Sequence, residues 1–133
     1  MGYALTATVP HPFEETLRAT RAALTDQGFG ILTEIDLAGT LKAKIGADIP
    51  AQVILGACRP ALAHAAIEAE PSIGLLLPCN VVVRASDDTT TIVEILDPTT
   101  MVTLTGNDSL TDVADVADDA RERLTAALHS LTA

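Results

Sequence analysis

The chain contains two cysteines, Cys58 in the stretch GACRP and Cys79 in the stretch LPCNV. A cysteine can act as a nucleophile, a redox group or a ligand for a soft metal, so chemistry is sought here first. Cys58 is followed by Arg59 and then by Pro60, a residue that favours the first turn of a helix. Because a neighbouring cation and a helix N-terminus both favour the thiolate, Cys58 is the candidate nucleophile. The alternative is a small buried thiol that only fills space.

Cys79 lies between Pro78 and Asn80 at the start of a predicted strand, where packing is the favoured role and a resolving thiol is the alternative. The two cysteines lack the C-x-x-C spacing, so the sequence predicts neither a thioredoxin-like motif nor a four-ligand zinc site. We expect both stretches to meet at one edge of the fold. A site there would be formed by Cys58, Arg59, Pro60, Pro78, Cys79 and Asn80.

The remaining reactive side chains do not assemble into a known motif. The three histidines, His11, His64 and His129, are spread along the chain and predict no metal site. Glu34 and Asp36 share a face of a predicted strand about 7 Å apart. That spacing permits acid–base chemistry, but it is more typical of a solvated sheet face. The last helix has an acidic side that we expect to face water rather than a metal, formed by Asp112, Asp115, Asp118, Asp119 and Glu122.

Composition excludes several classes of partner. The chain has 133 residues, which fits one domain over residues 1–133, and 48% of them are hydrophobic. Its formal net charge is −10, and such an acidic protein repels nucleic acid and anionic membranes. No apolar run is long enough to span a bilayer, and the first residues lack the features of an export signal. We therefore predict a cytoplasmic protein.

Strand and helix patterns alternate along the chain. Period-two alternation or short apolar runs predict strands over residues 3–9, 29–37, 52–58, 80–86 and 91–96. Helical spacing predicts helices over residues 12–27, 36–46, 60–70 and 109–131, while 73–79 fits either a helical turn or an extended linker. The strands around Asp87 and Asp88 predict a hairpin, which argues against a doubly wound parallel sheet. The expected fold is an α+β two-layer sandwich, with a mainly antiparallel sheet and helices on one face.

Side-chain spacing also predicts which residues face the core. In the strand over 29–37, alternation places Phe29, Ile31, Thr33, Ile35 and Leu37 on one face. In the helix from Pro60, the inward residues are Leu62, Ala63, Ala66 and Ile67. The last helix begins with a capping box of Ser109 and Asp112. Its apolar stripe is Leu110, Val113, Ala117, Ala120, Leu124, Leu128 and Leu131.

Three separated stretches resemble the domain of unknown function 302 family, which is found mainly in bacteria and archaea. They are GFGILTEIDLAGTLKAKIG, VILGACRPALAHAAIEAEPSIGLLLPCNVVVR and VEILDPTTM, and they cover residues 28–101. The resemblance implies a two-layer fold with an antiparallel sheet, similar to the TATA-binding-protein-like arrangement and commonly dimeric. It implies no established activity, and a shared fold does not imply DNA binding. The family's two cysteine blocks correspond to Cys58, Pro60, Pro78, Cys79 and Asn80, whereas Arg59 stands where relatives often carry asparagine.

The sequence therefore predicts a homodimeric domain that binds a small molecule or a partner beside the two cysteine stretches. One alternative is thiol-based redox or sulfur-transfer chemistry, with Cys58 as nucleophile and Cys79 as resolving thiol. Another is binding of a soft metal by both thiolates. The sequence identifies no cofactor and does not decide between a binding module and an enzyme.

Overall fold

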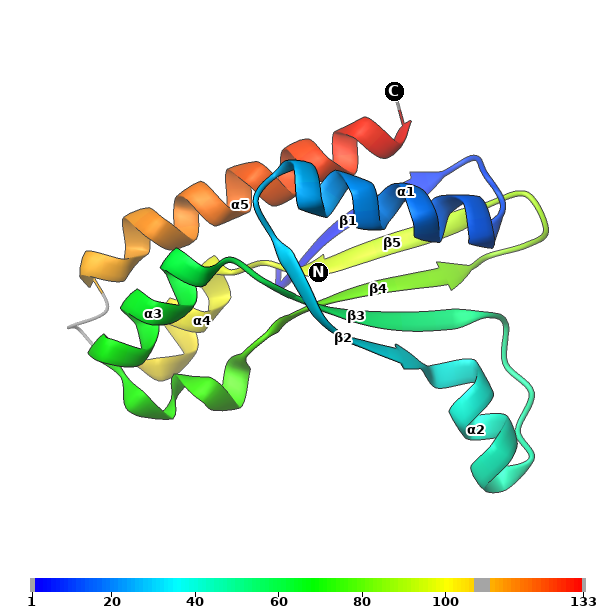
Figure 1. Cartoon of the computed structure of the whole chain (residues 1–133), viewed down its shortest axis with the longest axis horizontal. Helices are drawn as coiled ribbons and strands as arrows, with labels where there is room; N and C mark the ends of the chain where they lie inside the picture. The colour runs from blue at the N-terminus through cyan, green and yellow to red at the C-terminus, as the bar shows by residue number, and fades with distance from the viewer. Residues whose placement is uncertain (1, 107–110, 133) are drawn as a thin grey trace.

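A computed structural model describes residues 2–106 and 111–132, with the backbone alone for 111–113. Its centre is one five-stranded sheet in the order β1-β5-β4-β3-β2, in which every neighbouring pair is antiparallel (Figure 1). The strands are β1 Ala4–Val9, β2 Gly30–Asp36, β3 Gln52–Cys58, β4 Cys79–Ala85 and β5 Thr91–Leu96. The predicted α+β fold with a mainly antiparallel sheet is confirmed.

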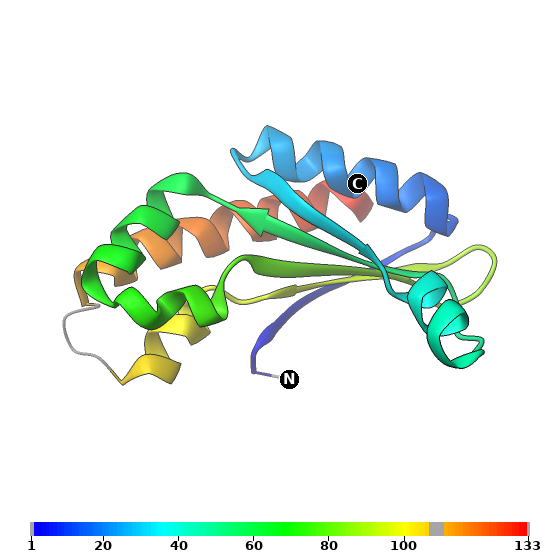
Figure 2. The ribbon, with the colours of Figure 1, turned by 60° about the horizontal axis from the view of Figure 1, so that its bottom comes forward.

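The helices lie on one face of the sheet and at its two ends. They are α1 Phe13–Asp26, α2 Leu37–Ile45, α3 Pro60–Ala69, the 3-10 helix η1 Pro71–Leu76, α4 Thr99–Thr105 and α5 Thr111–Thr132. Helices α1 and α5 pack together over one face, whereas the middle of the opposite face carries no described helix (Figure 2). We call this opposite face the open face. Within the described residues, no helix is both long and hydrophobic enough to cross a bilayer.

The core fills the space between the sheet and the two long helices. Leu55 of β3, Val81 of β4 and Val93 of β5 are fully buried against Leu24 of α1 and Leu124 of α5. Small residues at the helix surface, such as Ala117 and Ala120, let α5 lie close to its neighbours. The described part of the predicted α5 stripe is confirmed, since these two alanines are buried together with Leu124, Leu128 and Leu131. Ser109 lies outside the described residues.

Helix α2 follows β2 directly and projects from the sheet as an arm (Figure 1). Asp36 starts the helix, because its Oδ1 accepts a hydrogen bond of 2.9 Å from the backbone N–H of Gly39. Gly46 ends it with a φ of 68°, in the left-handed region that glycine tolerates best. The helix is where the sequence predicts it, although none of its residues is buried.

Strand β2 differs from its predicted pattern because it contains a β-bulge. Ile31 pairs with Ala57 and Thr33 with Gly56, and the register shifts between Ile31 and Thr33. The extra residue, Leu32, changes the parity of the strand, so Ile31 faces the helices while Thr33 and Ile35 lie on the open face. The prediction that Ile31, Thr33 and Ile35 share one face was therefore wrong.

Three smaller features differ from the sequence-based predictions or add to them. Ile67 of α3 was expected inside, yet 46% of it is exposed, because Leu62 and Ala66 form the buried contact. The ambiguous segment before Cys79 is mostly η1, with an extended backbone only at its end. Helix α4 was not predicted, because its seven residues are too few to show a helical period.

Candidate functional site

The two cysteine stretches meet at one end of the sheet, but their thiols face opposite sides of it. Ala57, which precedes Cys58, pairs with Cys79 across β3 and β4, so Ala57 and Cys79 share a face. Because neighbouring residues of a strand point to opposite faces, the side chain of Cys58 faces away from that of Cys79. Both cysteines are free. The expectation of one site with two adjacent thiols is corrected, since the sheet separates the sulfur atoms.

Cys58, Pro78 and Asn80 lie on the open face. Asn80 pairs with Gly56. Gly56 lies two residues before Cys58 in β3, so the two positions face the same side of the sheet. A Cβ added to Gly56 would lie 2.7 Å from Cγ of Pro78, so the proline ring rests over the glycine. Cys58 is half-buried and Asn80 is exposed. The structure thus places three of the predicted site residues on one surface.

Arg59 and Pro60 belong to the junction between β3 and α3. Arg59 points toward the helices, where its Nη1 lies 2.7 Å from Oδ2 of Asp119 in α5. The same oxygen accepts a hydrogen bond of 3.0 Å from Nε of Arg123. This hydrogen bond lowers the pKa of Asp119, and the charges of Arg123 and Arg59 lower it further. Pro60 occupies the first turn of α3 and is exposed. The Arg59 charge is therefore engaged by α5, whereas the sequence predicted that it would stabilise a Cys58 thiolate.

Cys79 is part of the core and has an exposed fraction of only 3%. Burial, followed by the charges of Cys58 and Asp97, raises the pKa of the Cys79 thiol to about 11. Such a thiol is protonated at neutral pH and is a poor nucleophile. Among the described residues, no group of three or more His, Cys, Asp or Glu side chains is placed to hold a metal ion.

The other candidate residues have structural partners. Glu34 forms an ion pair with Arg21 of α1, and Asp36 caps α2. Glu34 therefore ties β2 to α1 and Asp36 caps α2, and these contacts account for both carboxylates without acid–base chemistry. His64 lies on the exposed side of α3 as predicted, with its Nε2 3.0 Å from Oε1 of Glu68.

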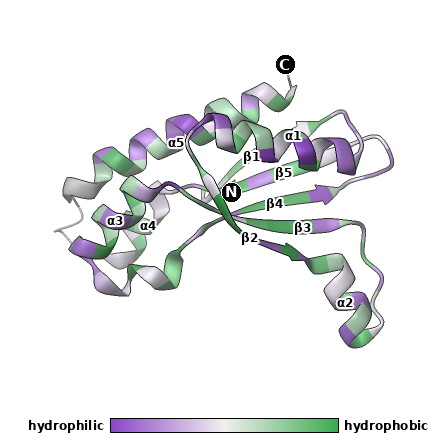
Figure 3. Cartoon of the chain, in the orientation of Figure 1, coloured by the Kyte–Doolittle hydropathy of each residue, from purple (hydrophilic) through white to green (hydrophobic). Residues whose placement is uncertain are grey.

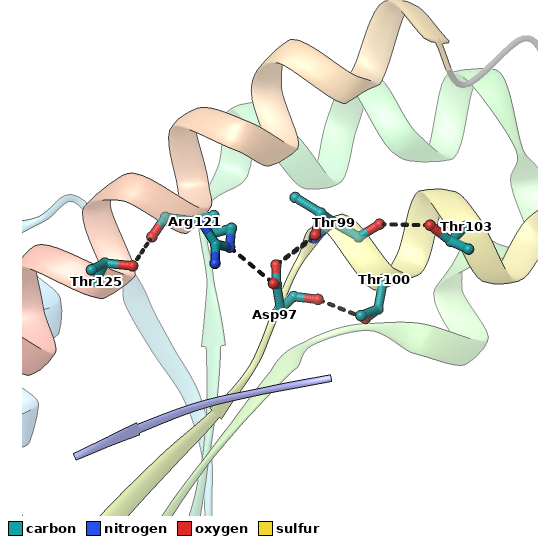
Figure 4. Close-up of polar contacts among 6 residues, drawn as sticks. All are labelled: Asp97, Thr99, Thr100, Thr103, Arg121 and Thr125. Atoms are coloured by element: carbon teal, nitrogen blue, oxygen red, sulfur yellow. Dashed lines mark hydrogen bonds and ion pairs between the residues drawn. The ribbon is translucent and has the colours of Figure 1, made fainter. Parts of the chain in front are cut away.

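Asp97 is a buried carboxylate near the pocket that sequence reasoning missed. It follows β5 and is buried, and its Oδ1 accepts hydrogen bonds from the backbone N–H of Thr99 at 3.0 Å and from the hydroxyl of Thr99 at 2.8 Å. Its Oδ2 accepts from Nε of Arg121 in α5 at 2.9 Å (Figure 4). The backbone N–H of Asp97 donates to the carbonyl oxygen of Tyr3 at 2.8 Å. Asp97 thus ties β5 to α4, to α5 and to the residues before β1.

Opposing effects act on the Asp97 carboxyl. Burial works to raise its pKa, but the hydrogen bonds from Thr99 and the hydrogen bond and charge of Arg121 outweigh burial, so the pKa is lowered. The sequence signal for this site is the stretch DPTT after an apolar strand. Asp followed by Pro and Thr is typical of a turn that starts a helix, and it would have indicated both Asp97 and α4.

A pocket of about 310 Å³ opens on the open face beside Asn80. Its walls are mostly aliphatic, and its polar groups are the Tyr3 hydroxyl, the Asn80 amide and the Glu94 carboxylate. The lining residues are Tyr3, Ala4, Asn80, Val82, Glu94, Ile95 and Leu96. Of the predicted site residues, Asn80 is the one that lines this pocket. Tyr3, which Asp97 holds through the backbone, is 55% exposed at its rim.

On the open face, the strands beside the pocket carry both apolar and polar side chains, because Val82, Ile92 and Leu96 alternate with Asn80, Arg84 and Glu94. Figure 3 shows stretches of hydrophobic colour on β3, β4 and β5 that hydrophilic residues interrupt. The charged pair beside the pocket is Arg84 and Glu94, with Nε of Arg84 donating to Oε1 of Glu94 at 3.0 Å. A second, separate apolar groove of about 350 Å³ lies between η1 and α4, where Leu75 and Leu104 are exposed.

The fold and the site define an α+β protein with a five-stranded antiparallel sheet, one helical layer and a pocket on the open face. The family model described as Domain of unknown function DUF302 matches residues 5–131, and the chain belongs to this family. The chain is also similar to the crystal structure of an uncharacterized conserved DUF302 protein from Bacillus stearothermophilus. The two share 28% sequence identity with a TM-score of 0.83, over 97% of this chain and 98% of the other. Comparison with curated proteins gives no match.

Proposed function

We propose that this protein is a homodimeric binding domain whose ligand, a small molecule, occupies the pocket beside Asn80. The observation that carries this proposal is a cavity of about 310 Å³ outside the helical layer, with aliphatic walls and a few convergent polar groups. Ligand sites in proteins have this character and begin at about 300 Å³. The site lies next to the Cys79 stretch but uses the open face rather than the two thiols.

The lining residues favour one chemical class of ligand. Tyr3 and Asn80 supply both donors and acceptors, while Val82 and Leu96 supply apolar contact. Glu94 places a carboxylate in the wall, and the chain as a whole has a net charge of −10. Arg84 pairs with this carboxylate, but the charge of the chain as a whole disfavours an anion, so the pocket fits a small, largely apolar molecule that is neutral or cationic and carries one or two hydrogen-bonding groups.

Binding of the neutral apolar dye Nile red tests the pocket. We expect its fluorescence to rise on binding to the wild-type protein. Ala4→Phe fills the pocket from β1 and should weaken dye binding about tenfold or more, because the apolar site is lost. The matched control is Thr8→Phe, which adds the same ring to the open face of the same strand outside the pocket.

Two results would contradict the pocket as the site. One is equal dye affinity in the wild-type protein and Ala4→Phe. The other is loss of dye binding in Leu75→Ser, because Leu75 lines the separate groove between η1 and α4.

Thiol chemistry at Cys58 is the second candidate function. In its favour, Cys58 is half-buried on the open face and lies at the N-terminal end of the ten-residue helix α3. Against the sequence-based version, Arg59 pairs with Asp119, and Cys79 lies on the other face with a raised pKa. The same separation weakens the proposal that both thiolates hold one soft metal ion. Cys58 would therefore act without Cys79 as its resolving thiol.

Alkylation kinetics separate the two candidates. In Cys79→Ser, the rate of reaction with iodoacetamide against pH reports the Cys58 thiol alone. A midpoint well below about 8.5 would favour a nucleophile, whereas a midpoint near that value is expected of an ordinary thiol and would leave the binding function.

A further inference from the structure

The two edge strands of the sheet, β1 and β2, differ in how they are protected. An edge strand presents unpaired backbone groups, and proteins usually blunt it with charges, prolines or a bulge so that no further strand pairs with it. Strand β2 is blunted in this way, because it contains the bulge at Leu32 and carries Glu34 and Asp36. Strand β1 has the sequence ALTATV, without charge or proline, and pairs with β5 in one unbroken register. Among the described strands, β1 is therefore the edge that is open to another strand.

The pairing with β5 shows which backbone groups of β1 point outward. The backbone N–H of Asp97 donates to the carbonyl oxygen of Tyr3, so these two residues form a hydrogen-bonded pair. Such pairs alternate along an antiparallel ladder, so Leu5 also bonds to β5, whereas the N–H and C=O groups of Thr6 and Thr8 point to the free edge. The side chains of both threonines are exposed on the open face.

A groove of about 430 Å³ follows this edge, between β1 and α5. Residues 4–7 of β1 all line it, so the groove borders the strand along its edge rather than under one face. From α5 the lining residues are Arg121, Thr125, Leu128, His129 and Thr132. The lining side chains that can carry a charge are Arg121 and His129, and both are basic although the chain has a net charge of −10. Charge complementarity therefore indicates an acidic occupant.

The polar residues of the groove form a row whose spacing matches a strand. Arg121, Thr125 and His129 are four residues apart and lie on one side of α5, which contacts β1. Successive members of the row rise by about 6 Å, close to the roughly 6.6 Å between alternate residues of a strand. The ion pair of Arg121 with Asp97 uses Nε, so the terminal Nη groups can donate to another acceptor (Figure 4). His129 is exposed and has an N–H donor in either protonation state.

We propose that the β1 edge binds an extended acidic segment of another protein, which adds to the sheet as a strand antiparallel to β1. Main-chain hydrogen bonds with Thr6 and Thr8 hold the added strand, and its alternate side chains give specificity. Two carboxylates four residues apart face α5 and reach Arg121 and His129. The side chains between them lie beside the threonines of β1, where another threonine is a favourable cross-strand neighbour. This site goes beyond the proposed small-molecule pocket, whose lining shares Ala4 alone with the groove.

Two labelled synthetic peptides test the charge preference by fluorescence anisotropy. The probe consists of threonine, glutamate, threonine, serine, threonine, glutamate and threonine, and the control carries lysine in place of both glutamates. We expect the glutamate peptide to bind about tenfold or more tightly than the lysine peptide, because its carboxylates meet Arg121 and His129. The net charge of −10 alone would favour the lysine peptide, so the two explanations predict opposite orders. Equal binding, or tighter binding of the lysine peptide, would overturn the inference.

Backbone methylation of the glutamate peptide tests strand pairing. In an antiparallel strand, the residue opposite Thr6 exchanges both hydrogen bonds with it and has its side chain on the same face. Methyl groups on the amides of the two threonines beside the serine therefore remove donors to β1 and should weaken binding about tenfold or more. Methyl groups on the two glutamate amides point away from β1 and should weaken it much less. The same affinity for both methylated peptides would show that the peptide does not pair as a strand.

A carboxylate in the middle of the row tests the α5 side of the groove. Thr125→Glu should weaken binding of the glutamate peptide about tenfold or more, because like charges then meet. The matched control, Ala126→Glu, adds the same charge at an exposed position of α5 outside the groove and should bind like the wild-type protein. Equal losses in both variants would assign the effect to net charge and contradict the site. Nile red binding to Thr125→Glu should be unchanged, because Thr125 lies outside the small-molecule pocket.

The competing occupant of the edge is β1 of a second copy. Thr6→Pro removes an outward N–H without breaking the ladder to β5, and proline is tolerated at such edge positions. We expect this variant to bind the glutamate peptide about tenfold or more weakly and to keep the oligomeric state of the wild-type protein in light scattering. A wild-type dimer that dissociates in Thr6→Pro and binds neither peptide would assign the edge to a second copy and overturn the inference.

Discussion

At the scale of single residues, side-chain direction decides which chemistry is available. Cys58 and Arg59 are adjacent in sequence, yet Cys58 faces the open side of the sheet and Arg59 pairs with Asp119 on the helical side. Proximity along the chain therefore does not place the cation at the thiol. Asp97, in contrast, also contacts residues that are distant in sequence. Its buried carboxylate accepts hydrogen bonds from Thr99 and Arg121, and its backbone N–H donates to the carbonyl oxygen of Tyr3. The Asp97 side chain therefore fixes the junction of β5, α4 and α5.

Replacing Asp97 should destabilise the protein. Asp97→Asn removes the charge that pairs with Arg121 and should lower the free energy of unfolding by about 1–3 kcal/mol, as expected for hydrogen bonds to a charged group. Urea unfolding at pH 7 measures the change. Asp118→Asn, an exposed carboxylate on α5, is the control and should lie within about 0.5 kcal/mol of the wild-type protein. Equal losses in both variants would contradict the role given to Asp97.

The effect of Asp97→Asn should depend on pH. The folded state lowers the pKa of Asp97, so the carboxylate contributes stability above its unfolded pKa of about 3.9, and this stability is lost as the pH falls through the folded pKa. The difference in unfolding free energy between the wild-type protein and Asp97→Asn should therefore be constant near neutrality and shrink below about pH 4. A difference that grows in acid would have the wrong sign for this mechanism.

At the scale of elements, small departures from regular structure set the faces of the sheet. The bulge at Leu32 moves Thr33 and Ile35 to the open face, where the side chain of Thr33 lies against Gly56. Pro78 covers the same glycine from the segment before β4. Gly56 therefore allows β2, β3 and the Pro78 segment to approach one another closely beside the pocket.

Adding one methyl group at Gly56 tests this packing. In Gly56→Ala, the new Cβ would overlap Oγ1 of Thr33 and lie 2.7 Å from Cγ of Pro78. We expect a loss of about 1–3 kcal/mol in unfolding free energy, because the Thr33 side chain and the rigid Pro78 ring must shift. Thermal or urea unfolding measures it, and Thr33→Ala in the same chain should recover part of the loss. The absence of any recovery would mean that Thr33 is not the obstacle.

At the scale of the whole molecule, the distribution of charge matters more than its sum. The net charge of −10 opposes self-association, while the open face is neutral because Arg84 and Glu94 pair. The helical side presents its acidic residues to water.

If the protein forms the homodimer proposed above, salt should strengthen it, because the chain is acidic overall. Raising the ionic strength from about 0.01 M to about 0.15 M shortens the Debye length from about 30 Å to about 8 Å and screens the repulsion between the two acidic chains. Sedimentation equilibrium should give a smaller dissociation constant at the higher salt concentration. A larger constant would mean that attraction between charges holds the two copies together, which would contradict a dimer whose formation is opposed by its net charge.

The sequence by itself determined the family, the α+β class and most of the elements. Local rules account for this, because alternation in β1, the caps of α2 and the stripe of α5 depend on residues close together in the chain.

Only the tertiary structure decided where the candidate site lies. The direction of each thiol depends on the pairing of β3 with β4, and the faces of β2 depend on one bulge residue. The pocket joins Tyr3, Asn80 and Glu94, which are distant in sequence and meet only because β1 and β4 both pair with β5. Such contacts are set by strand order and register, which no local pattern of residues specifies.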